Sequence, residues 1–167
     1  GIQFTTVQLK ELRYAALLHD IGKIAVPESV LDKKNKLLDS EITTIEYRLH
    51  YWKGQGADPG RVARYAAHIR KVNIPKPMND DDVKLLTEIM MEKFTDVDGQ
   101  VKALLTEYEY ENLSIQKGNL TKAERRQIEQ HIVDTWEILK GIPWPHDLIS
   151  VPNIAACHHE KKNGSGY

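Results

Sequence analysis

Apolar residues recur at helical spacing along most of this chain, and this periodicity restricts its fold more than any other feature. Leu9, Leu12, Ala16 and Leu17 lie on one side of a first expected helix, which ends near residues 19–20. The same spacing predicts further helices over residues 28–31, 40–53, 59–72, 81–94, 122–140 and 152–160. We find no strong strand run, so the sequence predicts an all-α fold.

Residues with local structural preferences support several of these boundaries. Asp58 and Pro59 suit the N-cap and first position of a helix. Thr121 and Glu124 have the spacing of a capping box, which predicts a helix start at residue 122. The Asp-Gly pair at residues 98–99 predicts a tight turn with a small hairpin.

Composition narrows the classes of function. The 167 residues carry a formal net charge of −1, which excludes a globally basic binder of nucleic-acid polymers or anionic membranes. Cys157 is the single cysteine, which excludes an internal disulfide; we read it as a small buried residue. No apolar run approaches the roughly 18 residues of a membrane span. We therefore expect a cytoplasmic protein without a membrane span, and we expect the chain, which starts without Met, to be a trimmed piece.

Five residues have the character of metal ligands. His19 is followed by Asp20 at a helix end, His131 lies mid-helix on an inward face, and His158 and His159 are adjacent. Imidazoles and a carboxylate from separate helices suit iron, manganese, zinc or nickel. A pair of such ions can polarise a phosphoryl group and lower the pKa of a bound water. We expect the remaining histidines to lie away from any metal, with His50 and His68 on helices and His146 in an exposed connector.

Three motifs occur in order and resemble the HD-GYP family, a branch of the HD-domain phosphohydrolases. They are HDIGKIAVPESVL, then LSIQKGNLTKAERRQIEQHIVDTWEIL, then VPNIAACHHEKKNGSGY. The resemblance covers roughly Leu9 to Leu38 and Asn112 to Tyr167. It implies an HD-domain helical bundle formed by residues 1–41 and 112–167. Residues 42–111 would then be an inserted helical hairpin, which either packs on the domain or serves as a dimerisation or signalling arm.

The resemblance also implies an activity and a site. The family hydrolyses cyclic dinucleotides, chiefly cyclic di-GMP, with two or three divalent ions, often iron or manganese. Asp20 would bridge two ions, Lys23 would contact the substrate phosphate, and Gly166 and Tyr167 would shape the substrate pocket. The implied metal ligands are His19, Asp20, His131, His158 and His159.

The chain departs from the family pattern at several points. Ligands that the family has upstream of its HD pair, and an aspartate ligand downstream of its GYP tyrosine, fall outside this sequence. Lys161 and Asn163 replace the usual arginine and aspartate of the last motif. Two roles stay open for Glu160: it either orients a ligating histidine or is an ordinary acid on the surface.

Two other functions therefore stay open. One is an HD phosphohydrolase that acts on another nucleotide or on a phosphomonoester. The other is a non-catalytic module that binds a cyclic dinucleotide or a diguanylate-cyclase partner. A homodimer is compatible with either.

Overall fold

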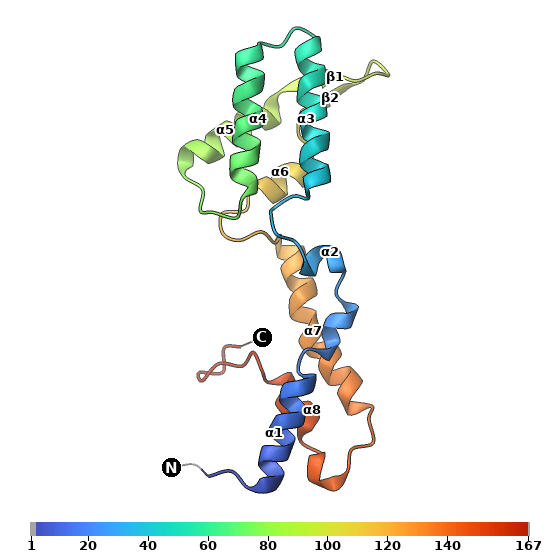
Figure 1. Ribbon diagram of the computed structural model, residues 1–167. Coiled ribbons are helices and arrows are strands. Elements are labelled where there is room, and N and C mark those ends of the chain that lie inside the picture. Colours follow the sequence, from blue (N-terminus) through green and yellow to red (C-terminus); the bar gives the residue numbers. More distant parts are fainter. Residues whose placement is uncertain (1–2, 167) are drawn as a thin grey trace. The chain divides into compact units, whose positions relative to one another are not determined.

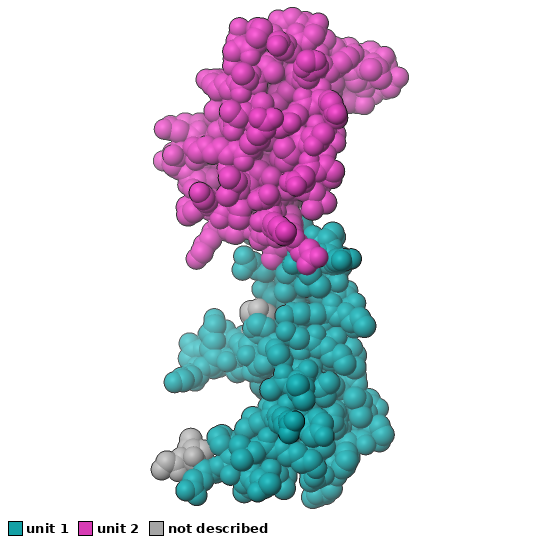
Figure 2. All heavy atoms as spheres, in the orientation of Figure 1, with its two compact units in different colours: residues 1–31, 122–167 teal, residues 32–121 magenta. Residues whose placement is uncertain are grey.

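The computed structural model describes residues 3–166 and confirms the all-α fold class, with helices over most of this range (Figure 1). The chain divides into two compact units (Figure 2). Unit 1 comprises residues 1–31 and 122–167, and unit 2 comprises residues 32–121. Within the described range no helix has the length and apolarity that crossing a bilayer requires.

Unit 1 is built from two separate chain segments. Helix α1 packs against α8, and the long helix α7 packs against both α8 and the short 3₁₀ helix η1. Its small core contains Ala15, Leu139, Leu148, Val151 and Ala155. The elements are α1 (Thr6–Leu18), η1 (Ile21–Ala25), α2 (Glu28–Leu31), α7 (Lys122–Lys140), η2 (His146–Leu148) and α8 (Val151–Ala156).

Unit 2 has its own, larger core, to which α3, α4, α5 and α6 contribute. Helix α4 lies against α3, α5 and α6. Tyr65 of α4 and Ile89 of α5 are completely buried there. The elements are α3 (Asp39–Gly54), α4 (Pro59–Asn73), α5 (Asp80–Met91), β1 (Lys93–Thr95), β2 (Val101–Ala103) and α6 (Glu107–Leu113).

Unit 2 extends ten residues beyond residues 42–111 at each end. The extension has a physical basis, because the flanking residues bond within the unit. The backbone N–H of Lys36 donates to the Asn73 carbonyl at 3.0 Å, and the Lys33 ammonium donates to Asn112 Oδ1 at 2.8 Å. That unit 2 is an insertion into an HD domain stays a prediction.

The small hairpin predicted around residues 98–99 is confirmed. Strands β1 and β2 pair antiparallel, with Phe94 opposite Lys102. Gly99 has a φ of +79°, and Asp96 Oδ1 accepts backbone hydrogen bonds from Asp98 and Gln100 inside the turn. The expectation that the preceding helix continues to residue 94 was wrong, because the backbone becomes extended at Glu92 and enters β1.

The predicted last helix through residue 160 was also wrong. Helix α8 ends at Ala156, and His158 and His159 lie in the turn that follows. The side chain of His158 donates from Nδ1 to the Ala155 carbonyl at 2.7 Å. That carbonyl would accept from the His159 N–H if the helix continued. In the structure the Ala155 carbonyl instead accepts the His158 side chain in the turn that follows α8.

Gly22 marks the closest approach between η1 and α7. A Cβ atom built on Gly22 would lie 2.1 Å from the His131 carbonyl oxygen and 2.5 Å from the Thr135 backbone nitrogen. Both obstacles are backbone atoms of α7, so they cannot rotate away. Only glycine allows this packing.

Gly22→Ala is therefore expected to lower the free energy of unfolding by roughly 1–3 kcal/mol, the usual range for overpacking. Urea unfolding followed by circular dichroism measures the change. Gly54→Ala is the control, because nothing lies within 4 Å of a Cβ at the end of α3. That substitution should leave stability unchanged or raise it by up to about 1 kcal/mol. Equal midpoints for the two variants would contradict the close packing at Gly22.

In unit 2, Asp82 combines helix capping with an ion pair. Its carboxylate accepts from Lys71 Nζ at 2.6 Å and from the Asn79 backbone N–H at 3.3 Å. The hydrogen bond from Lys71 is the main cause that holds the pKa of Asp82 below its ordinary value, against the opposing effect of burial. The ionised carboxylate therefore stabilises the folded state above the ordinary pKa of 3.8, and this contribution is lost as the pH falls below that value.

Asp82→Asn should keep an acceptor for Asn79 but remove the titration. We expect wild-type stability to fall more steeply than that of Asp82→Asn between pH 5 and pH 2, as measured by urea midpoints. Asp81→Asn is the matched control, because Asp81 lies in the same helical turn with its side chain 93% exposed. It should follow the wild-type pH dependence, and parallel curves for all three proteins would refute the assignment to Asp82.

Candidate metal centre

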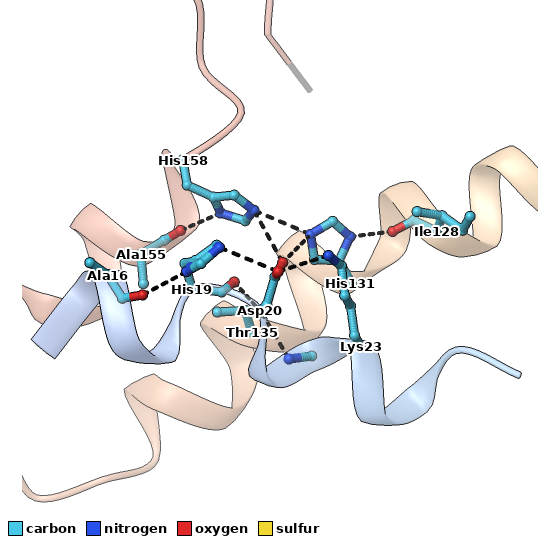
Figure 3. Close-up of polar contacts among 10 residues, drawn as sticks. Ala16, His19, Asp20, Lys23, Ile128, His131, Thr135, Ala155 and His158 are labelled. Atoms are coloured by element: carbon cyan, nitrogen blue, oxygen red, sulfur yellow. Dashed lines mark hydrogen bonds and ion pairs between the residues drawn. The ribbon is translucent and has the colours of Figure 1, made fainter. Parts of the chain in front are cut away.

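Asp20 lies at the centre of a cluster of histidines in unit 1 (Figure 3). Helix α1 ends at Leu18, and the turn that follows presents His19 and Asp20. Asp20 Oδ2 lies 3.3 Å from His19 Nε2, and Oδ1 lies 3.4 Å from His131 Nε2. Oδ1 also lies 3.7 Å from His158 Nε2. Three chain segments thus direct the same ring atom toward one carboxylate.

The orientation of each ring is fixed by its own backbone. His19 Nδ1 donates to the Ala16 carbonyl at 2.8 Å, and His158 Nδ1 donates to the Ala155 carbonyl at 2.7 Å. His131 Nδ1 bonds the Ile128 carbonyl in the same way. Because a carbonyl oxygen only accepts, Nδ1 must carry the proton in all three rings. In the neutral imidazoles this leaves the Nε2 lone pairs pointing toward Asp20.

This arrangement concentrates electron pairs in one place. His131 Nε2 and His158 Nε2 are 3.3 Å apart, although neither carries a proton in this tautomer. Asp20 Oδ1 is buried and has no hydrogen-bond partner among the described residues. Facing lone pairs beside an unpaired carboxylate oxygen repel one another unless a cation lies between them. The donor set therefore fits a divalent transition metal.

His159 extends the cluster. The ring centroid of His159 lies 4.2 Å from that of His158 and 5.4 Å from that of His131. His131, His158 and His159 form one group whose ligand atoms lie within 4.8 Å of one another, and His19, Asp20 and His158 form another. Burial, and then the charges of His158 and His131, lower the pKa of His159. A neutral His159 has a lone pair available for a metal at physiological pH.

Lys23 is the cation closest to this carboxylate in the structure. Its ammonium donates to Asp20 Oδ2 at 2.7 Å across one turn of η1. Burial alone would raise the pKa of Asp20, but the hydrogen bond from Lys23 and the neighbouring His19 outweigh it and lower the pKa. Asp20 is thus held ionised. The resemblance implies that Lys23 contacts a substrate phosphate. Its side chain is 38% exposed in the ion pair with Asp20.

An apolar pocket opens beside the cluster. Its volume of about 390 Å³ lies within the range usual for small-molecule sites. Helices α1 and α8 form its walls, and two candidate ligands form its polar end. The lining residues are Leu12, Ala15, Ala16, His19, Ile154, Ala155 and His158.

Glu160 organises the loop that follows the two histidines. Its Oε1 accepts from the backbone N–H of Lys161 at 2.8 Å and from that of Gly166 at 2.7 Å. These bonds lower the pKa of the Glu160 carboxyl. A Cβ on Gly166 would lie 2.5 Å from the His159 carbonyl oxygen, so glycine is required at this contact. Tyr167, the other expected pocket residue, lies outside the described residues.

The remaining histidines lie away from the cluster, as expected. His50 is exposed on α3, and His146 is exposed in η2. His68 is buried in unit 2, where its Nε2 lies 3.0 Å from the Asp82 carbonyl oxygen. Cys157 is exposed, so its interpretation as a buried residue was wrong.

Comparisons with known proteins agree with this chemistry. Residues 108–167 match the family described as HD domain. A Vibrio cholerae serotype O1 protein named 3'3'-cGAMP-specific phosphodiesterase 3 is 37% identical over 86 residues, which cover 47% of this chain. The match covers only 19% of that relative. No solved structure matches the chain significantly. The family match thus extends over part of the chain, and neither match singles out the HD-GYP branch.

The loop bonds of Glu160 predict a measurable effect on local order. Glu160→Ala removes the oxygen that accepts both bonds and should accelerate tryptic cleavage after Lys161 and Lys162, whereas Glu160→Gln keeps an acceptor oxygen and should be cleaved more slowly than Glu160→Ala. Glu137→Ala is the control, since Glu137 pairs only with Lys140 on the helix surface. Limited trypsin digestion read by mass spectrometry distinguishes the variants. Equal cleavage rates in wild type and Glu160→Ala would show that these bonds do not order the loop.

Proposed function

We propose that this chain carries the metal centre of a phosphodiesterase that hydrolyses a cyclic dinucleotide. The observation that carries the proposal is the convergence of three Nε2 atoms on the Asp20 carboxylate, whose Oδ1 lacks a hydrogen-bond partner among the described residues. The HD domain match and the partial identity to a phosphodiesterase support the same chemistry.

In this proposal the two overlapping groups hold two divalent ions, and the resemblance to the HD-GYP family implies iron or manganese. When bound, the ions would activate a phosphoryl group and a water molecule as Lewis acids. The proposed ligands are His19, Asp20, His131, His158 and His159. A third ion has no ligands of its own among the described residues.

The protein's own groups would prepare the site for the reaction. The backbone carbonyls of Ala16, Ile128 and Ala155 hold the imidazoles with Nε2 free, so no tautomer change precedes binding. Asp20, kept ionised, supplies negative charge between the histidines. Lys23 is one η1 turn from Asp20 and partly exposed, so its ammonium can move to a substrate phosphate and offset developing charge.

The substrate class rests on two further observations. The apolar pocket beside His19 and His158 offers a recess for one base next to a metal-bound phosphate. The sequence HHEKKNGSG resembles the HD-GYP signature, and the relative from Vibrio cholerae is named for 3'3'-cGAMP. We therefore propose cyclic di-GMP and 3'3'-cGAMP as the substrates to compare. An activity toward phosphomonoesters is the second candidate, supported by the HD domain match alone.

Metal content is the first test. Protein loaded with Mn²⁺ and then dialysed should retain about two ions per chain by elemental analysis. His19→Ala should lose at least one, because it removes a ligand beside Asp20. His50→Ala is the matched control, since His50 is exposed on α3 in the other unit, and it should retain both ions. Absence of bound metal in the wild-type protein would reject the proposed centre.

Turnover is measured next on the metal-loaded protein with the two cyclic dinucleotides and a phosphomonoester panel. We expect metal-dependent release of linear dinucleotide that His19→Ala abolishes. Tight binding of a cyclic dinucleotide without turnover would favour the non-catalytic module instead. Hydrolysis of phosphomonoesters alone would establish the second candidate.

A further inference from the structure

Thr135 makes an unusual pair of hydrogen bonds beneath the histidine cluster. It lies on α7 one turn after His131 and is completely buried. Its hydroxyl donates to the backbone carbonyl of His19 at 3.1 Å. The same oxygen accepts from the backbone N–H of Gly22 at 3.0 Å. One side chain therefore connects α7 to the backbone before and after Asp20.

Other threonines in the helices of this chain behave differently. The hydroxyls of Thr43, Thr44 and Thr87 each donate to the carbonyl four residues earlier in their own helix. That local bond is the usual one for a helical threonine. The corresponding acceptor for Thr135 would be the His131 carbonyl. Thr135 instead directs its donor and its acceptor to a different segment of the chain, so its bonds join two elements.

The packing of η1 on α7 leaves little freedom for the segments that Thr135 connects. A Cβ on Gly22 would collide with the His131 carbonyl oxygen and the Thr135 backbone, so η1 lies directly on α7 at this point. His131 and Thr135 are four residues apart and share one face of the helix. The hydrogen bonds of the Thr135 hydroxyl therefore determine where Asp20 lies relative to His131, which is one turn away on α7.

We infer that Thr135 is a positioning residue that fixes the spacing between the His19–Asp20 turn and His131, and thereby sets the metal affinity of the centre. The inference rests on the proposed metal centre but concerns a residue outside its ligand set. Without the hydroxyl, the His19 carbonyl and the Gly22 N–H lose a buried partner, and the turn is free to shift away from α7. A shift of a few tenths of an ångström changes the separation of the ligand atoms without removing any of them.

The test compares Thr135→Val, which keeps the shape and removes the hydroxyl, with Thr135→Ser, which keeps both hydrogen bonds. The apparent Kd for Mn²⁺ is measured by competition with a fluorescent chelator. We expect Thr135→Val to bind about 10–100-fold more weakly, the effect usual for residues that orient metal ligands, and Thr135→Ser to stay near wild type. Thr135→Ala provides the same comparison if valine is not accommodated.

Two controls separate positioning from general stability. Thr87→Val removes a helical hydroxyl in unit 2 and should lower the urea midpoint while leaving the Kd for Mn²⁺ unchanged. The ring ¹⁵N chemical shifts of His19 and His131 in the metal-free protein should move in Thr135→Val and not in Thr87→Val. A general loss of stability would not produce that selective change.

The outcomes are distinct. A folded Thr135→Val protein with wild-type Kd would overturn the positioning role and leave the metal centre intact. A wild-type protein that binds no Mn²⁺ would overturn the proposed function, and the positioning role with it. Weak binding in Thr135→Val, restored in Thr135→Ser, would establish the role.

Discussion

The meeting of histidine lone pairs at the Asp20 carboxylate is the constraint around which unit 1 is organised. Each ring bonds a backbone carbonyl three residues earlier through Nδ1, so in the neutral imidazole the nitrogen that faces Asp20 carries no proton. The same local bond therefore occurs at the end of α1, inside α7 and after α8. At the end of α8 the bond from His158 lies in the turn that follows the helix, whereas α7 continues past His131. The same local hydrogen bond thus orients the three rings in different backbone settings.

The two units differ in what stabilises them. Unit 2 contains the larger apolar core, and several of its buried polar groups are paired within it. The ammonium of Lys36 is fully buried and donates to the Leu113 carbonyl at 3.0 Å. Unit 1 has a small core, and its buried polar residues His131 and Thr135 lie at the histidine cluster. A metal ion at that cluster would add binding free energy to the folded state of the unit with the smaller core.

Much of the helical structure could be predicted from sequence, because apolar periodicity and caps act locally. The start of α7 at Lys122 and the turn at Gly99 are examples. The five candidate ligands come from three ordered motifs and lie together in the structure, although their role as ligands stays a prediction. The end of α8 was missed because residues 157–162 include no glycine or proline that would mark it. Cys157 was misplaced for a related reason: it follows the helix rather than lying on its inward face.

The roles of Thr135 and Glu160 could not have been derived from sequence. For Thr135, nothing in the local pattern shows that its partners lie more than a hundred positions away. Glu160 had two open interpretations, and the structure shows a third, in which it binds the backbone of its own loop. Both roles depend on which segments meet in the folded chain. The ion pair between Lys23 and Asp20 illustrates the same limit.

The two ends of unit 2 are tied to each other, and this has a consequence for how the chain folds. The Asn119 amide donates to the Lys33 carbonyl, so the points where the chain enters and leaves unit 2 are neighbours. Once unit 2 is folded, the segments carrying Asp20 and His131 are joined by a short effective tether rather than by a long flexible loop. The entropy of closing that loop is then already lost, and the effective concentration of one half of the histidine cluster around the other is high. Unit 2 thereby acts as a folding scaffold for the assembly of a site to which it contributes no ligand.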